Sequence, residues 1–513
     1  MALLRSIATV GSLTMVSRVF GFVRDILIAA TLGAGMAADV FFVAFKFPNL
    51  FRRLFAEGAF SMAFVPLFAG LLEEEGEEKA KQFADQAMAV LLWALLAFVV
   101  IIELAMPWVM RAFAPGFLSE PEKFALAVEL TRITLPYLVF ISLVSLMAGV
   151  LNSFGKFAAA AASPILLNVC LIGAVLVFSS LADSPGHALA WGVFVAGIVQ
   201  FFWLVIHCRR TGFSPGLVRP RLNPNVKLLI RRALPVALGA GVYQINLLID
   251  TIIASFLPEG SISYLFYADR VNQLPLGVVG VAVGTALLPL LSRQIRAGDE
   301  SAAAHSQNRA VEFSFLLTLP AAAALFVISQ PLVQVLFERG QFGEAQTLAT
   351  AQALSIFAIG LPAYVLVKAL APGFFARGDT ATPVKISVAA MVVNVVLSLI
   401  LMGPFLHVGI AMATAASSWL NAGVMAFVLY RRGHMGADAR LKSRLPRTAF
   451  ASLVMAIVLY FGMDQLSPWL DGGVLERAVA LGILIAGGLL SFAVLAQLSG
   501  ATRLNDIKSL RRG

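Results

Sequence analysis

The chain has 513 residues, of which 59% are hydrophobic and 13% are charged. This composition, with a mean hydropathy of +0.88, excludes an ordinary soluble fold and predicts a polytopic membrane protein. The net charge of +10 raises the question of nucleic-acid binding, but the placement of the basic residues argues against it.

About fourteen apolar segments are long enough to cross a membrane as helices, so the expected fold class is all-α. Arg18 and Arg24 interrupt the first segment, whose long apolar run is not expected to be a cleaved signal peptide. Cys170 and Cys208 fall in or beside segments, and no disulfide framework is implied. The segments lie near 6–31, 37–71, 84–112, 124–151, 158–181, 187–208, 229–257, 262–292, 310–337, 348–376, 384–403, 407–431, 446–465 and 475–499.

Lys and Arg gather in every second connection between these segments. They are densest at 209–232 and 431–447, whereas the connections near 182–186 and 257–261 contain none. This positive-inside pattern predicts that both termini are cytoplasmic. The basic charge is therefore explained by topology, and no nucleic-acid partner is expected.

A weak internal repeat divides the chain. The hexapeptide starting at Asp25 (DILIAA) is similar to the one starting at Asp250 (DTIIAS). Two lobes of six helices each would start on the same side of the membrane, so a pseudo-two-fold axis along the membrane normal should relate them. The predicted parts are an N-lobe at 1–212, a basic linker at 213–228, a C-lobe at 229–433, two further helices at 434–500 and a cytoplasmic tail at 501–513.

Seven cationic side chains lie inside or beside apolar segments. A charge near the bilayer centre costs at least ~3 kcal/mol, so such residues usually face a polar cavity on a substrate path. The excess of positive charge predicts an anionic substrate, and arginine suits phosphate because its guanidinium binds two oxygens at once. The seven are Arg18, Arg24, Lys46, Arg52, Arg53, Arg270 and Lys368.

The second segment carries a polar stripe of Asp39, Lys46, Arg53 and Glu57, which would share one face of a continuous helix. Pro48 is expected to kink or unwind that helix, which would let Arg52 point inward instead of Arg53. A structural interpretation stays open, in which these charges only pair with nearby acids and stabilise helix packing.

Asp250 lies in an otherwise apolar segment, where a carboxylate must be protonated, paired or bound to a cation. Asn394 and Thr414, from later segments, offer neutral oxygens suited to Na⁺. These three residues form a candidate cation site for Na⁺ or H⁺ as a coupling ion. The alternative is that Asp250 is simply hydrogen-bonded to polar neighbours. No catalytic motif, metal cluster or other cofactor site is expected.

Long motifs give the chain a resemblance to the MurJ (MviN) family of lipid II flippases, within the superfamily of multidrug, oligosaccharidyl-lipid and polysaccharide exporters. The resemblance covers nearly the whole chain and is strongest at 10–70. Its motifs are SRVFGFVRD at 17–25, GAG at 33–35 followed by Asp39, FKFPNLFRRLFAEGAF at 45–60, YADR at 267–270, KALAPGF at 368–374 and DTATP at 379–383.

The resemblance implies a transporter, not an enzyme, with fourteen membrane helices. The last two helices would form a groove for a lipid tail. The substrate would be lipid II, an undecaprenyl-diphosphate-linked MurNAc-pentapeptide-GlcNAc, moved by alternating access from the inner to the outer leaflet of the bacterial cytoplasmic membrane for peptidoglycan synthesis. Cell-wall synthesis or division proteins are expected as partners, with a role in cell shape. The resemblance supports Arg18, Arg24, Arg52 and Arg270 as substrate ligands with Asp39 as an ion-pair partner, and Lys46, Arg53, Glu57 and Lys368 in second rank.

Three alternatives remain open from the residues alone. A flippase for another polyprenyl-diphosphate-linked glycan, such as an O-antigen unit, would need a similar set of cations. A cation-coupled multidrug exporter fits less well, because many such drugs are themselves cationic. A membrane scaffold for cell-wall assembly would not need charge near the middle of the membrane.

Overall fold

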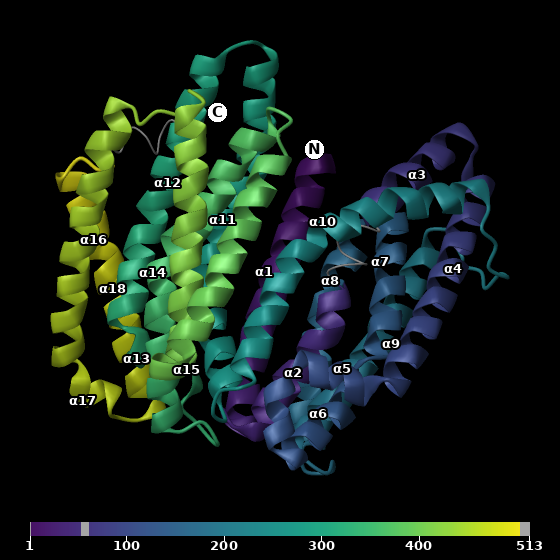
Figure 1. Ribbon diagram of the computed structural model, residues 1–513, viewed down its shortest axis with the longest axis horizontal. Coiled ribbons are helices and arrows are strands. Elements are labelled where there is room, and N and C mark those ends of the chain that lie inside the picture. The colour runs from purple at the N-terminus through teal and green to yellow at the C-terminus, as the bar shows by residue number, and fades with distance from the viewer. Residues whose placement is uncertain (1, 53–60, 503–513) are drawn as a thin grey trace. The chain divides into compact units, whose positions relative to one another are not determined.

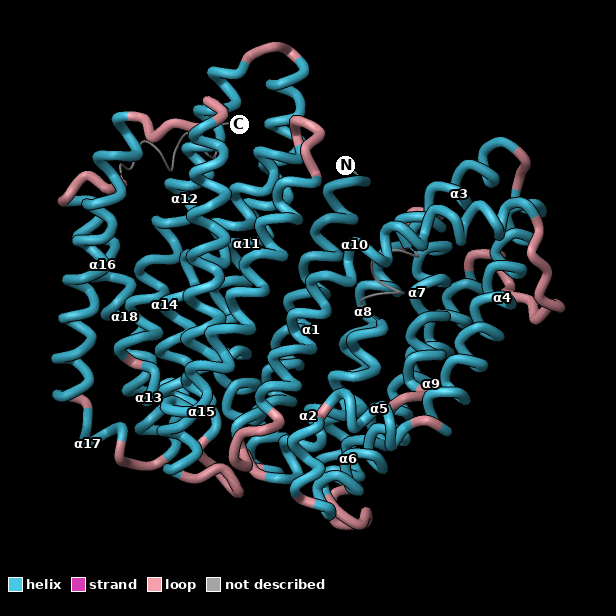
Figure 2. Tube along the Cα trace, viewed as in Figure 1, coloured by secondary structure: helices cyan, strands magenta, loops and turns pink. Residues whose placement is uncertain are grey.

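The computed structural model describes residues 2–52 and 61–502, and these residues form helices joined by short turns and loops (Figures 1 and 2). Within this described part, nine helical stretches are long and apolar enough to cross a membrane. The all-α membrane fold predicted from the composition is therefore confirmed. The count of fourteen spans stays a prediction.

Contacts between Cα atoms divide the chain into two compact units. Unit 1 comprises Met1–Ser263 with Arg339–Phe342, and unit 2 comprises Tyr264–Glu338 with Gly343–Gly513. The helix at 224–254, which the sequence division assigns to the C-lobe, packs with unit 1. Packing units and sequence repeats thus have different boundaries in this chain.

The helices of unit 1 include a short 3₁₀ helix, η2, and a π-helical segment, η3. Ser184 caps α9 and Asn223 caps α10, because each side-chain oxygen accepts a hydrogen bond from a backbone N–H of the first turn. The elements are α1 (Ala2–Leu32), α2 (Met36–Phe51), α3 (Ser61–Glu74), α4 (Glu77–Leu104), α5 (Met106–Phe113), η2 (Pro115–Ser119), α6 (Pro121–Thr134), α7 (Tyr137–Ser153), α8 (Phe157–Gly173), η3 (Ala174–Phe178), α9 (Pro185–Arg210) and α10 (Pro224–Ala254).

Helix α10 is held in unit 1 by contacts along its length and by contacts of the linker that precedes it. The helix packs on α3, α4 and α5. At its end the N–H of Gly116 donates to Ser255 Oγ at 3.0 Å, and a Cβ atom at Gly116 would overlap the Ser255 carbonyl. In the linker before α10, the N–H of Gly216 donates to Asp85 Oδ1 on α4 at 2.8 Å. The basic linker before α10 is therefore fixed to the same helix that α10 covers.

Unit 2 begins within a long helix and ends with a separate helix pair. Asp299 and Asp438 cap α12 and α16 in the same way as Ser184 caps α9. Leu406 has φ 51° and ψ −132°, so α15 is two helices joined at the turn predicted near 403–406. The elements are α11 (Ser261–Arg296), α12 (Glu300–Val327), α13 (Ser329–Phe337), α14 (Glu344–Phe375), α15 (Ala381–Arg431), α16 (Ala439–Gln465), α17 (Ser467–Leu470) and α18 (Val474–Leu498).

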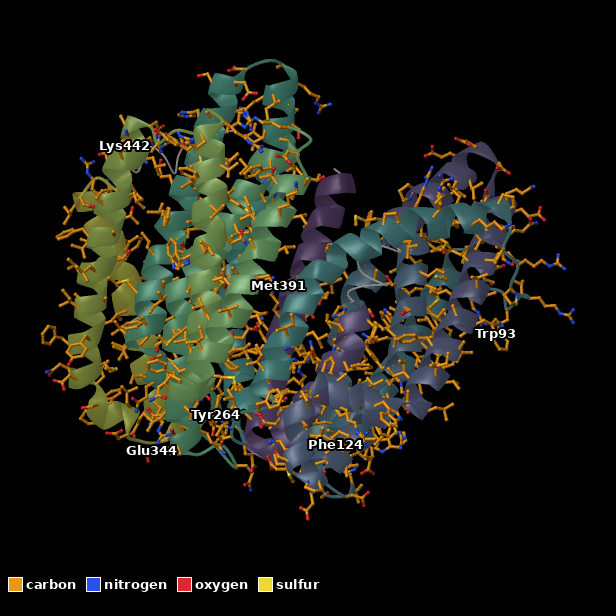
Figure 3. All side chains as sticks on the ribbon, viewed as in Figure 1. Trp93, Phe124, Tyr264, Glu344, Met391 and Lys442 are labelled. Carbon is orange, nitrogen blue, oxygen red and sulfur yellow. The ribbon has the colours of Figure 1, made fainter. Side chains whose placement is uncertain are left out.

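The last two long helices, α16 and α18, pack on each other at one edge of unit 2 (Figure 1). Ion pairs fasten this pair at both ends. Near Lys442 (Figure 3), Arg444 Nη1 donates to Glu312 Oε1 on α12 at 2.8 Å. Near Glu344, at the other end of the unit, Arg477 Nη1 donates to Glu338 Oε1 at 3.1 Å. The α16–α18 pair is therefore anchored to the helices of unit 2, although it lies outside the repeat.

Candidate functional site

Arg24 on α1 lies in a buried polar network. Its Nε and Nη2 donate to Asp25 Oδ1 at 2.9 and 2.6 Å, and its Nη1 donates to Asn168 Oδ1 on α8 at 2.8 Å. Arg24 is 5% exposed and Asp25 is 2% exposed. Asn168 in turn donates to the carbonyl of Ser17 at 3.0 Å. The network joins α1 to α8, which pack along each other.

This network shows which cation Asp25 contacts. In the structure Asp25 pairs with its neighbour Arg24. Asn168 was not predicted from the sequence, because an Asn in an apolar helix gives no sign of its distant partner. In this arrangement Arg24 links α1 to α8.

Asp39 on α2 is the centre of a second buried network in unit 1. Its carboxylate accepts hydrogen bonds from the N–H of Gly260 at 2.8 Å, the N–H of Ser263 at 2.9 Å and Ser263 Oγ at 2.6 Å. Lys123 Nζ lies 3.6 Å from Asp39 Oδ2 and is also buried. A buried carboxylate is stable when several donors and a cation surround it, so this site anchors α2 to the start of α11.

Lys123 is the cationic partner that the sequence did not reveal. It follows Pro121 and Glu122 at the start of α6, which reads as an ordinary exposed first turn. In the structure its ammonium lies 4.8 Å from the centre of the Phe117 ring and 3.7 Å from Glu120 Oε1. Asp39 was predicted to be an ion-pair partner, and its partner here is this lysine.

The remaining charges of the second predicted segment are only partly described. Helix α2 continues through Pro48 to Phe51. Lys46 hydrogen-bonds to Thr251 Oγ1 on α10, and Arg52 Nε donates to Asn49 Oδ1 at 3.0 Å. Arg53 and Glu57 lie outside the described residues, so the predicted stripe can be followed only from Asp39 to Lys46.

Arg18 differs from Arg24 because its side chain is exposed. It lies in the interior of the 31-residue helix α1, whose other side chains near it are largely apolar. An exposed guanidinium at such a position requires water or an anionic ligand around it. Arg18 is therefore open to water or an anion, whereas Arg24 is held in a buried network.

Unit 2 contributes two more of the predicted cations. The guanidinium carbon of Arg270 lies 4.9 Å from the centre of the Phe266 ring, one turn earlier on α11. Lys368 on α14 is exposed. The predicted cation-site residues divide between the units, with Asp250 on α10 of unit 1 and Asn394 and Thr414 on α15 of unit 2. Asn394 is buried and lies 3.4 Å from Ser417 Oγ, which donates to its Oδ1.

Comparison with known proteins gives the family. The sequence profile described as "Lipid II flippase MurJ" matches residues 28–480. The chain belongs to the lipid II flippase MurJ family. A "Probable lipid II flippase MurJ" of Rhizobium meliloti (strain 1021) is 46% identical, with 100% of this chain and 97% of that protein covered. The "Lipid II flippase MurJ" of Burkholderia cenocepacia is 38% identical over 84% of this chain and 85% of that protein.

Solved structures agree on the fold of this MurJ-family chain. "Lipid II flippase MurJ, inward closed conformation" matches with a TM-score of 0.77 at 24% identity, covering 95% of this chain and 98% of that one. An inward-facing multidrug resistance transporter of the MATE family matches with a TM-score of 0.68 at 16% identity over 85% of this chain and 98% of that one. The predicted family and the predicted class of transporter are both confirmed.

Proposed function

We propose that this chain moves lipid II from the inner to the outer leaflet of the bacterial cytoplasmic membrane for peptidoglycan synthesis. The observation that carries the proposal is the match over the whole chain, at 46% identity, to a protein named as a probable lipid II flippase. The cationic residues within apolar helices support the same conclusion, because a diphosphate-linked lipid is an anion that must pass the membrane core.

The arrangement of contacts refines which cations would bind the diphosphate. Arg24 is held by Asp25 and Asn168, so we assign it to shaping the site, with Arg18 and Arg270 as the direct ligands. The exposed side chain of Arg18 favours this assignment. Arg52, Lys46 and Lys368 remain supporting candidates. Arginine suits this task since it stays charged when desolvated and binds two phosphate oxygens together.

The lipid tail would stay in the membrane, along the α16–α18 pair. The exposed side chains of these helices are strongly apolar, as a surface in contact with acyl or polyprenyl chains requires. They include Phe450, Leu453, Ile457, Tyr460, Phe461, Leu489, Leu490 and Leu498. The anchoring of the pair to Glu312 and Glu338 would keep this surface in place while the head group crosses.

Coupling to a cation is a further part of the proposal. Asp250 with Asn394 and Thr414 would take Na⁺, or Asp250 alone would take H⁺, when the lobes are arranged for it. Both termini would be cytoplasmic, according to the distribution of Lys and Arg. Protein partners would come from the machinery that uses lipid II for cell-wall synthesis or division.

The test is outward translocation of labelled lipid II in proteoliposomes containing the full chain. Arg18→Ala and Arg270→Ala should each lower the rate at least tenfold at equal protein content. Arg296→Ala is the matched control, because Arg296 lies at the end of the same helix as Arg270 and is exposed there. Normal translocation by both variants would remove these arginines as ligands. If the wild type did not translocate lipid II but did translocate another polyprenyl-diphosphate-linked glycan, that glycan would replace lipid II as the proposed substrate.

A further inference from the structure

A cavity of about 770 Å³ opens at one end of unit 1, between α5, α6 and α9. Its size lies within the ~300–1,000 Å³ that is usual for a small-molecule site. One face of α6 contributes Phe124, Glu129 and Arg132, and the start of α9 contributes His187 and Trp191. Phe124 marks this end of α6 in Figure 3. None of these residues belongs to the transport site proposed above.

The charged side chains that line the cavity are of both signs. Glu129 and Asp183 supply two carboxylates, and both are exposed. Glu129 Oε1 lies 3.3 Å from His187 Nε2, while His187 Nδ1 lies 2.8 Å from Ser184 Oγ. The one arginine that lines the cavity, Arg132, also contacts Glu103: its Nη2 donates to the Glu103 carbonyl at 3.4 Å, and its Nε lies 3.9 Å from Glu103 Oε2. The site therefore suits a ligand that carries one cation and one anion.

The position of the cavity along the helices indicates the level of the membrane surface. Trp191 is 53% exposed, and nearby on α5 Trp108 is 69% exposed; such tryptophans concentrate at membrane–water interfaces. His187 and Arg210 lie at opposite ends of α9, roughly 35 Å apart for a regular helix. Since basic Arg209 and Arg210 indicate the cytoplasmic side, the cavity lies at the outer surface of the membrane.

We propose that this cavity binds the head group of a zwitterionic aminophospholipid of the outer leaflet, of the phosphoethanolamine type. The primary ammonium would donate to Glu129 and Asp183, and the phosphate would accept from Arg132. The indole of Trp191 and the ring of Phe124 would pack against the glycerol and the first acyl carbons.

Other occupants fit the cavity less well. An anionic phospholipid would place its charge beside two carboxylates. A choline head group carries a cation without N–H donors, so it cannot hydrogen-bond to those carboxylates. Among the residues that the structure describes, no group of three His, Cys, Asp or Glu side chains is arranged to hold a metal ion. Hydrogen bonding to a primary ammonium is what selects the proposed ligand.

The experiment is native mass spectrometry of the purified full chain, titrated with phosphatidylethanolamine, phosphatidylcholine and phosphatidylglycerol of identical acyl chains. Wild type should bind the ethanolamine lipid at least about fivefold more tightly than either of the others. Glu129→Gln with Asp183→Asn should remove this preference, and Arg132→Gln should weaken binding of the ethanolamine lipid. Glu122→Gln is the matched control, because Glu122 lies on the same helix and is exposed but does not line the cavity.

Two results would overturn the proposal. Equal binding of the three lipids by the wild type would show that the cavity does not select an ammonium, and this comparison does not depend on any variant folding. A preference for the ethanolamine lipid that survives in the double variant Glu129→Gln with Asp183→Asn would place the lipid elsewhere on the protein.

Discussion

Replacing Arg24 by Ala should destabilise the protein before it affects any ligand. The substitution removes three hydrogen bonds, two to Asp25 and one to Asn168. It also leaves the Asp25 carboxylate, which is 2% exposed, without its adjacent cation. Removing one partner of a buried ion pair costs about 3–5 kcal/mol, because the remaining charge stays desolvated. We take about 3 kcal/mol, the lower end of this range.

The assay is thermal unfolding of the purified chain in detergent. A loss of 1 kcal/mol lowers Tm by roughly 1–2 °C in a chain of this size, by extension of the values for smaller domains, so Arg24→Ala should lower Tm by roughly 3–6 °C. The double variant Arg24→Met with Asp25→Asn should recover at least half of the loss, because it leaves no buried charge. Arg296→Ala is the control. Because Arg296 is exposed, this substitution should change the free energy of unfolding by less than about 0.5 kcal/mol.

A Tm for Arg24→Ala equal to that of the wild type would contradict this expectation. In that case the network would not hold α1 to α8, and Arg24 would be available as a substrate ligand. Lipid II translocation by the double variant separates the two roles further. Recovery of stability together with translocation would fit a purely structural arginine, whereas stability without translocation would assign it a part in transport.

Three further predictions concern other parts of the chain. Gly116→Ala should cost about 1–3 kcal/mol, because the added methyl overlaps the Ser255 carbonyl; an unchanged Tm would show that α10 can shift at no cost. Arg477→Ala should cost about 1.5–3 kcal/mol through the lost charged hydrogen bond to Glu338, and a double-mutant cycle with Glu338→Gln should show coupling between the two residues. Hydrogen bonds from Arg432 and Thr382 hold the pKa of Asp379 well below its usual range, so its ionised form is stabilised in the folded state. That contribution is complete above the pKa of Asp379 in the unfolded chain, about 4, and is lost as the pH falls from this value toward the lower pKa of the folded state. The stability difference between the wild type and Asp379→Asn should therefore stay constant from about pH 5 to 8 and shrink below about pH 4.

The class of protein could be predicted from the sequence because hydropathy and charge distribution are properties of segments. The turn near 403–406, for example, is visible as a break between two apolar runs, and the structure has it at Leu406. The positions of Arg18 and Arg24 in the first apolar segment were equally visible. Their different environments were not, because one is exposed while the other is buried against α8.

The polar networks were not predictable for a related reason. Lys123 and Asn168 become informative only when α6 and α8 are placed beside α2 and α1, and nothing local in the sequence fixes that placement. The resemblance implied Asp39 as an ion-pair partner, and in the structure Lys123 Nζ lies 3.6 Å from its carboxylate. Its hydrogen bonds to Gly260 and Ser263 depend on backbone groups, which every residue carries and no sequence pattern marks.

The packing of α10 with unit 1 has a consequence for how this polypeptide could be divided. A cut at residues 213–223, where the sequence halves meet, would leave α10 on the C-terminal fragment and expose the surfaces of α3, α4 and α5 that it covers. Arg339–Phe342, which also belongs to unit 1, would be lost from the N-terminal fragment by the same cut. An N-terminal half produced alone would therefore lack part of the core of unit 1, and the C-terminal half would carry α10 without the helices that it packs on. Stable material is expected only when both halves are made together in one membrane.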